Sequence, residues 1–478
     1  MRTHTKLSAS ILGFLGLAGF CILLGCSGSA GTGVAPMMVT ASDAPLSNIL
    51  SAVVTISSAS LTAGGTSVSV IAHPVTVELS GLGATQEPIE FANVAFGTYN
   101  AVTLTVSSAV VTYVNGSGQV TTTTATLTQP TITVALAPAL AISNSGEAQL
   151  QLAFNLAQSF SITGSTVTFG PAINTMAAQV SGESAGERQV EIAGLATSVS
   201  ASSITIQAGD SGKKFTFTIN SSTQFPTGVI TSSIQPGAIV QVQGQTQTDG
   251  SLLALTITQE SAGNNSGQQE DGARGIVTSV TSSSGTLTGF TMVPREDYGS
   301  ISSTTAALNV SVSSSTTYSV PESAQQAGVA ASAFTSAEIF PGQSVVVAGT
   351  VGTSGVLTAQ QVTLAAESVA GTLAATPQGT SPDLTFALTL PASSLLTTYT
   401  HLTSLDVATN QATEFGNGMS ATSFATLAAS TNVETHGYLI QSNGGNFVLY
   451  AAGIAQVEVP ETPETPEIPG IATASNGQ

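Results

Sequence analysis

One short segment of the chain has the residue types of a hydrolytic nucleophile. Gly209-Asp210-Ser211-Gly212 places a serine in a small polar segment. Such a serine becomes a nucleophile when a histidine base and an orienting carboxylate are held beside it. No histidine lies near this segment in sequence, and it separates two alternating runs, 204–206 and 215–217. Asp and Gly favour a hairpin loop at such a place. We interpret the segment as a turn, and predict no catalytic residue and no enzymatic activity.

Residues that could bind a metal are also sparse. His436 has no second histidine or acidic residue at a recognisable metal spacing. The acidic pairs Glu270-Asp271 and Glu296-Asp297 are adjacent in sequence, whereas calcium sites draw several oxygens, often from alternate positions. The sequence predicts no metal site and no cofactor, with a calcium site as the weaker alternative.

Cys26 has the clearest predicted chemistry. It follows an apolar run, 11–24, which itself follows Arg2 and Lys6. A basic start, a short apolar core and a small residue before the cysteine form an export signal, and the run is too short to span a bilayer. The pattern resembles the bacterial lipoprotein signal, which implies that Cys26 is diacylated and becomes the mature N-terminus. Two acyl chains would hold the protein stably on a membrane. The alternative is an ordinary secretory signal.

The composition restricts the classes of partner. Removal of residues 1–25 takes away Arg2 and Lys6, which reduces the basic residues from 7 to 5 against 26 acidic ones. Nucleic-acid binding needs Lys and Arg to neutralise phosphates, so this balance excludes it as a function. The same acidic balance disfavours peripheral binding to a membrane of anionic lipids. Because 42% of the residues are hydrophobic and only 7% are charged, the chain can form packed cores with uncharged surfaces.

Short alternating runs predict an all-β protein. Strict period two appears at residues 102–106, 132–136 and 150–156, with Gly and Asn pairs between runs. Regular short strands with turn signals indicate a β-sandwich over residues 38–180. A flexible tether is expected over residues 26–37, after the signal peptide 1–25.

The predicted sandwich resembles the N-terminal domain of a family of uncharacterised bacterial lipoproteins. The matching segments are Ser42-Asp43-Ala44-Pro45, Phe96-Gly97-Thr98-Tyr99 and residues 154–160. The resemblance implies a sandwich-like, carbohydrate-binding domain. Sugars usually stack on aromatic rings, which makes Tyr99, Tyr113 and Asp43 the candidate ligand-binding residues, although Tyr99 could instead be a core residue.

The second half of the chain repeats itself. Pro236-Gly237 is followed by Gly244 and Gly250, and Pro341-Gly342 is followed at the same offsets by Gly349 and Gly355. A third copy, which lacks the Pro-Gly pair, contains His436-Gly437. We expect each copy to form a small OB-like barrel: Pro-Gly makes the turn into a strand, the next Gly kinks that strand and the last one serves a hairpin.

Repeats of this kind resemble an uncharacterised bacterial family of OB-like barrels. The predicted fold is therefore an N-terminal β-sandwich followed by three small OB-like β-barrel repeats. Their expected boundaries are 190–260, 273–366 and 368–457, with a Pro/Glu-rich disordered tail over 458–478.

These observations favour a non-enzymatic, lipid-anchored protein of the bacterial envelope. We expect the barrels to extend from the sandwich as a structural or presenting arm; the alternative is a carbohydrate-binding lipoprotein with its site in the sandwich. Expected partners are the membrane, through the diacylglyceryl anchor, and a polysaccharide or an envelope protein. Ser27 follows the cysteine where an Asp would favour retention in the inner membrane, so the outer membrane is the expected location.

Overall fold

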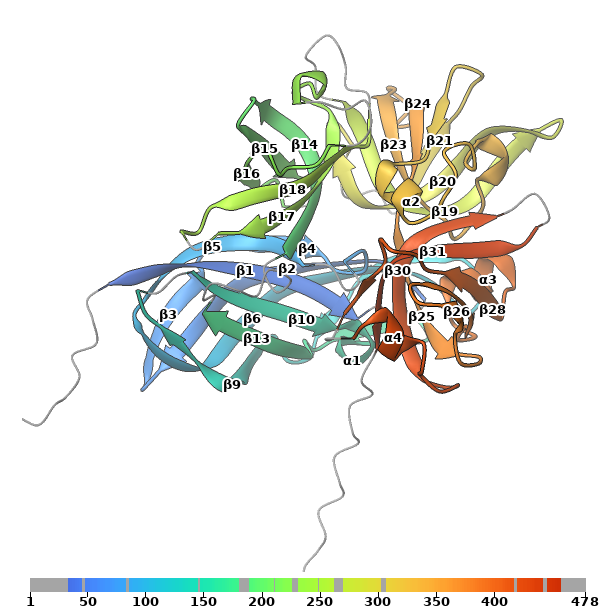
Figure 1. Cartoon of the computed structure of the whole chain (residues 1–478). Helices are drawn as coiled ribbons and strands as arrows, with labels where there is room; N and C mark the ends of the chain where they lie inside the picture. Colours follow the sequence, from blue (N-terminus) through green and yellow to red (C-terminus); the bar gives the residue numbers. More distant parts are fainter. Residues whose placement is uncertain are drawn as a thin grey trace, which may run out of the picture.

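The computed structural model describes residues 33–44, 48–82, 86–144, 147–179, 189–209, 211–225, 231–247, 249–261, 270–301, 307–416, 419–441 and 445–456. Cys26, the predicted signal peptide and the predicted tail lie outside these residues. Within them the prediction of an all-β fold with multiple sheets and small barrels is confirmed (Figure 1). No described helix is long and apolar enough to cross a membrane.

The N-terminal domain, here called the sandwich, is built from two large β-sheets and one small one. Its elements are β1 (Val34–Ala44), β2 (Ile49–Ala63), β3 (Thr66–Ile71), β4 (Val75–Glu78), β5 (Glu87–Ala95), β6 (Gly97–Val114), β7 (Val120–Thr124), β8 (Thr126–Leu127), β9 (Thr131–Ile142), β10 (Ala148–Asn155), α1 (Leu156–Ser159), β11 (Phe160–Thr163), β12 (Thr166–Phe169) and β13 (Ile173–Gln179). One sheet has the order β13-β10-β1-β5, and the other has the order β3-β2-β6-β7, with β4 on β2 and β9 on β6. Alternate residues of both sheets form one core.

Strand β1 begins earlier than the sequence predicts. The last four residues of the expected tether, 34–37, belong to β1, which pairs with β5 on one side and β10 on the other. Ala35 and Met37 are buried between the sheets. A central strand is stabilised by pairing on both edges. Strand β1 can therefore include residues that look like a linker when the sequence is considered alone.

The first repeat forms a closed five-stranded barrel, here called barrel 1. Its elements are β14 (Gln189–Val199), β15 (Ser203–Ala208), β16 (Lys214–Thr218), η2 (Thr231–Ser233), β17 (Ile239–Thr246) and β18 (Leu252–Gln259). The strand order around the ring is β14-β15-β16-β18-β17, with β16 parallel to β18. The barrel interior is filled by apolar side chains, which include Phe217 and Ile257.

The second and third repeats close in the same order. Barrel 2 consists of β19 (Asp271–Ser283), β20 (Thr286–Tyr298), β21 (Leu308–Ser311), β22 (Thr317–Ser319), α2 (Glu322–Gln326), η3 (Ser336–Glu338), β23 (Ser344–Val351) and β24 (Leu357–Leu364). Barrel 3 consists of β25 (Glu367–Leu373), β26 (Gln378–Thr380), β27 (Asp383–Thr389), α3 (Leu395–Thr400), β28 (Ser404–Ala408), β29 (Glu414–Phe415), α4 (Ala421–Phe424), β30 (Asn432–Gln441) and β31 (Phe447–Gln456). Parallel pairs β21–β24 and β28–β31 occupy the place of β16–β18.

The repeated glycines have the roles that the sequence predicts. Gly237 and Gly342 take positive φ values of 94° and 96°, which the third position of a type II Pro-Gly turn requires. Further along, Gly244, Gly349 and Gly437 each lie at a register shift between the last two long strands of their barrel. A Cβ at any of the three would overlap a neighbouring residue. The third repeat therefore keeps the bulge even though it lacks the Pro-Gly pair.

The barrels do not extend away from the sandwich as we expected. Barrel 1 packs on β1 and β5, where Met38 joins the barrel's own core. Barrel 2 reaches the sandwich through Arg295, whose Nε donates to the carbonyl oxygen of Leu50 over 2.9 Å. Barrel 3 contacts barrel 2 through Gln343, which donates to the carbonyl oxygen of Leu439 over 3.1 Å. The four domains thus pack as one body (Figure 1). Local sequence patterns do not reveal this packing, because its contacts join residues that are far apart in the chain.

Candidate functional site

The two tyrosines proposed to bind sugar lie inside the sandwich. Tyr99 is 2% exposed and Tyr113 is 3% exposed, so neither ring has a free face on which a sugar could stack. The Tyr99 hydroxyl donates to the carbonyl oxygen of Ala95 over 2.8 Å, as in the tyrosine corners of other sandwiches. Asp43 belongs to β1, but its side chain lies outside what the structure describes, as does the whole of Cys26.

The segment 209–212 forms a hairpin loop between β15 and β16. Gly212 has a φ of 65°, and its amide donates to the carbonyl oxygen of Ala208 over 3.0 Å. Asp210 lies outside the described residues. Beside the loop, Lys213 forms an ion pair with Glu90 on β5. Lys213 therefore links barrel 1 to the sandwich.

Charged residues are rare in this chain, yet several of them meet where the four domains join. We call this place the charged junction and define it by Glu87 of the sandwich, Glu191 of barrel 1, Arg274, Arg295 and Glu296 of barrel 2, and His436 of barrel 3. They line a cavity of about 30 Å³, which is room for about one water molecule. The junction is therefore a closed contact between domains.

The arginines keep the junction charged. Burial lowers the pKa of Arg274. The nearby carboxylates of Glu260, Glu296 and Glu191 outweigh this effect, so the pKa lies above its ordinary value. Burial raises the pKa of Glu296, and Arg274 opposes that rise. Glu296 also accepts a hydrogen bond from the Tyr298 hydroxyl. Opposite charges that are enclosed together stabilise one geometry, because each would be costly without the other.

A serine and a histidine are hydrogen-bonded at the edge of this junction. Ser368 Oγ and His436 Nδ1 lie 3.1 Å apart on the paired strands β25 and β30. Burial lowers the pKa of His436, which favours its neutral form. This pair has the residue types of a nucleophile and its base. A cavity of about 30 Å³ leaves no room for a substrate, so we interpret the pair as part of the domain contact.

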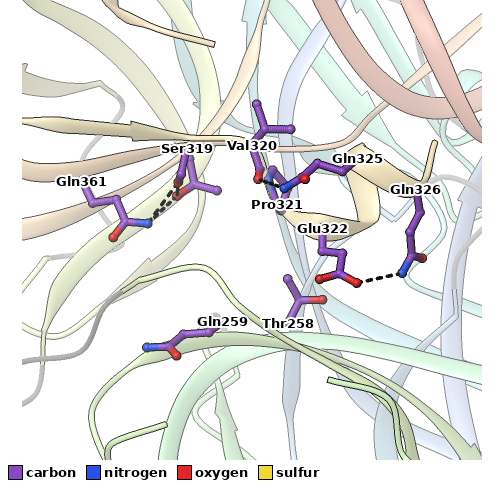
Figure 2. Close-up of a pocket in the computed structure, with 10 residues that line it drawn as sticks. Thr258, Gln259, Ser319, Val320, Pro321, Glu322, Gln325, Gln326 and Gln361 are labelled. Atoms are coloured by element: carbon purple, nitrogen blue, oxygen red, sulfur yellow. Dashed lines mark hydrogen bonds between the residues drawn. The ribbon is translucent and has the colours of Figure 1, made fainter. Parts of the chain in front are cut away.

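A polar groove lies between barrel 1 and barrel 2 (Figure 2). We call it the interbarrel groove; its volume is about 480 Å³. Its lining residues come from β18, from the end of β22 and the segment that joins it to α2, from α2 itself and from β24: Thr258, Gln259, Ser319, Val320, Pro321, Glu322, Gln325, Gln326, Gln361 and Thr363. Eight of these ten side chains are polar, and one of them is charged.

Gln361 is central to the side of the groove that barrel 2 forms. Its Nε2 donates to Ser319 Oγ over 3.1 Å, to Thr363 Oγ1 over 3.0 Å and to the carbonyl oxygen of Glu260 over 3.0 Å. The Thr363 hydroxyl donates to the same carbonyl oxygen over 2.9 Å. These bonds fasten the end of barrel 1 to β24 and keep the two sides of the groove at a fixed separation.

No local sequence pattern predicts the groove. One of its sides includes the short helix α2. The pairs Gln325-Gln326 and Gln360-Gln361 were a weak compositional signal. No local pattern brings them near Gln259, which lies in another barrel. Among the described residues, no group of His, Cys, Asp and Glu could hold a metal ion.

Two family models match parts of the chain. The family described as Domain of unknown function (DUF4382) matches residues 35–169, within the sandwich. The family described as Domain of unknown function (DUF5666) matches residues 193–258, within barrel 1. Both descriptions leave the function open. No curated protein matches the chain.

The chain also matches a solved structure, drosophila Unr CSD456. The two sequences are 12% identical, and the match covers 56% of this chain and 98% of that one, with a TM-score of 0.12.

Proposed function

We propose that this chain is a lipid-anchored, non-enzymatic protein of the bacterial envelope that acts as a structural or presenting body. The observation that carries the proposal is the packing of four domains around the charged junction. A closed junction with residues from every domain supports a rigid body with a constant surface. It does not suit an enzyme whose domains open and close around a substrate.

The anchor proposal rests on Cys26 and on the short distance to the fold. The first described strand begins at Val34, eight residues after Cys26. Eight residues span at most about 29 Å even when fully extended. If Cys26 carries the lipid, the sandwich is held close to the membrane surface. The surface that the protein presents to a partner then depends on how the four domains pack, since the barrels fold back against the sandwich.

The location proposal follows from the residue after the cysteine. Ser27 occupies the position at which an Asp favours retention in the inner membrane. We therefore propose that the protein is located in the outer membrane. An envelope protein or a polysaccharide is the proposed partner. For the carbohydrate-binding alternative, Tyr99 and Tyr113 offer no ring on which a sugar could stack, because both are buried.

The test of the anchor is a pair of cysteine substitutions in the full chain. Cys26→Ser removes the proposed acylation site, whereas Cys21→Ser changes a cysteine inside the predicted signal and serves as the control. We expect Cys26→Ser to move the protein out of the membrane fraction or to block its maturation, and Cys21→Ser to leave it there. Mass spectrometry of the mature N-terminal peptide should show a diacylglyceryl group on Cys26. Release of both variants, or an unmodified N-terminus elsewhere, would contradict the proposal.

A further inference from the structure

We propose that the interbarrel groove binds a neutral, hydroxyl-rich ligand, specifically a short segment of an uncharged oligosaccharide. The inference goes beyond the role of an anchored body and does not depend on it. It rests on the shape of the groove, on the hydrogen-bonding groups that face it and on the charges of its lining.

The size of the groove suits a small ligand. Small-molecule sites usually have volumes of roughly 300 to 1,000 Å³, and the interbarrel groove has about 480 Å³. The cavity at the charged junction, in contrast, has about 30 Å³. The interbarrel groove therefore has room for sugar units, whereas the cavity at the charged junction does not.

The groove is formed before any ligand binds. Gln361 and Thr363 fasten β24 to the carbonyl oxygen of Glu260, at the end of barrel 1. Helix α2 is fixed from the side of barrel 3, where the Tyr438 hydroxyl donates to Ser323 Oγ over 2.6 Å. Asn410 Nδ2 also donates to the carbonyl oxygen of Gln326 over 2.7 Å. A preformed site avoids the entropic cost of ordering its side chains on binding.

The polar groups in the groove match those of a polyol. Amide and hydroxyl side chains both donate and accept hydrogen bonds, as each sugar hydroxyl does. The Nε2 of Gln361 is used by protein acceptors, while its Oε1 has no hydrogen-bond partner among the described residues. Figure 2 shows Gln361 and Glu322 on the barrel 2 side, with Thr258 and Gln259 across from them on barrel 1. A hydroxylated ligand between these groups could bond to both barrels at once.

The charges of the lining exclude other ligand classes. None of the lining residues is Lys or Arg, and Glu322 is acidic, so a phosphate or a carboxylate ligand would lack a counter-charge. Val320 and Pro321 are the only apolar lining residues, which disfavours a hydrophobic ligand. Because the lining has no aromatic ring for stacking, we expect weak affinity, with a Kd on the order of 1 mM to 0.1 mM.

Ligand-observed NMR on the full mature chain tests the proposal. The probes are maltotetraose, cellotetraose, laminaritetraose and xylotetraose, with tetragalacturonic acid as the charged comparison. Gln361→Leu removes the central amide. Gln326→Leu changes an exposed residue whose side chain makes one long hydrogen bond, of 3.4 Å to Glu322, so this second variant should leave the fold intact. Gln378→Leu, on an exposed edge of barrel 3, is the matched control.

We expect saturation transfer to at least one neutral tetraose and none to the acid. Gln361→Leu should weaken that binding about tenfold, and Gln326→Leu should weaken it by a smaller factor, while Gln378→Leu binds as the wild type does. The proposal is overturned if no neutral probe binds or if the charged probe binds better. It is also overturned if both groove variants bind as the control does.

Discussion

Arg295 and Leu50 are 245 residues apart in sequence and are joined by a hydrogen bond of 2.9 Å from Nε to the carbonyl oxygen. The bond links barrel 2 to the sandwich. Around it, Leu50, Val114, Ile276 and Val293 form a small apolar cluster that both domains share. A guanidinium bonded to a carbonyl oxygen beside such a cluster favours one orientation of the contact, because the hydrogen bond is directional.

Replacing Arg295 with Met should therefore loosen the contact between barrel 2 and the sandwich. We expect the free energy of unfolding to fall by about 2 kcal/mol, since hydrogen bonds to charged groups contribute about 1.5–3 kcal/mol. Urea unfolding followed by circular dichroism measures the change. Lys214→Met, at an exposed position of barrel 1, is the control and should change the stability by less than about 0.5 kcal/mol. Equal losses in the two variants would show that the Arg295 bond adds nothing.

A buried carboxyl in barrel 3 predicts that the protein is less stable in mild alkali. Burial raises the pKa of Glu434 to about 8, and its Oε1 has no hydrogen-bond partner in the described part of the chain. The folded state therefore favours the protonated form. A raised pKa in the folded state gives stability that is complete below the ordinary value, near 4.5, and is lost as the pH rises through about 8.

The measurement is the free energy of unfolding of the wild type and of Glu434→Gln at pH 5 and at pH 8. The glutamine does not titrate, so the wild type should lose stability relative to the variant by a few kcal/mol between the two pH values. Burial raises the pKa of Glu367 to about 8 as well, and Glu367→Gln should act in the same direction. Parallel pH curves for the wild type and Glu434→Gln would show that Glu434 is ionised inside the fold.

The bulge glycines are the most direct link between the repeat in the sequence and the barrels. In Gly349→Ala the new Cβ would overlap the carbonyl oxygen of Thr358, and we expect barrel 2 to lose about 2 kcal/mol or more. Gly116→Ala is the matched control, because no atom lies within 4 Å of its Cβ position. Thermal unfolding of the two variants measures the difference. A Gly349→Ala variant as stable as the control would mean that the bulge does not need glycine.

The strands and turns that form each barrel could be predicted from the sequence, because the residues that determine them are close together in the chain. A Pro-Gly turn, a bulge glycine and a hairpin glycine recur at fixed offsets, and each acts on strands that are adjacent in the fold. The third repeat shows the limit of this reasoning. Its Gly437 was recognised without a Pro-Gly pair, and the structure places it at the same register shift as Gly244 and Gly349.

The packing of the domains and the groove could not be predicted in this way. Arg274 and Arg295 look like isolated surface charges in the sequence, but Glu260 and Glu191 of barrel 1 act on Arg274, and Leu50 of the sandwich accepts from Arg295. Gln259 and Gln361 face one groove from different barrels. Tyr99 has the residue type of a sugar-stacking ring, but its strand turns it into the core. In each case tertiary packing decides the role, and the sequence alone does not record that packing.

The buried position of Tyr99 makes a prediction that separates structure from binding. Tyr99→Phe removes the hydrogen bond to Ala95 and should reduce the free energy of unfolding by about 1 kcal/mol. Tyr99→Ala leaves a cavity in the core and should cost about 3–5 kcal/mol. Binding of neutral tetraoses by Tyr99→Phe should equal that of the wild type. Lost binding with unchanged stability would place the ring at a ligand site instead.

Small-angle X-ray scattering of the full chain with Cys26→Ser tests most directly whether the four domains form one body. A single compact body with the length of residues 33–456, about 420 residues, has a radius of gyration of about 22 Å, and we expect a value close to this with one main peak in the distance distribution. Four domains of roughly 100 residues in an extended row would give about 35 Å. A value near the larger figure, with separate peaks for the domains, would contradict the account.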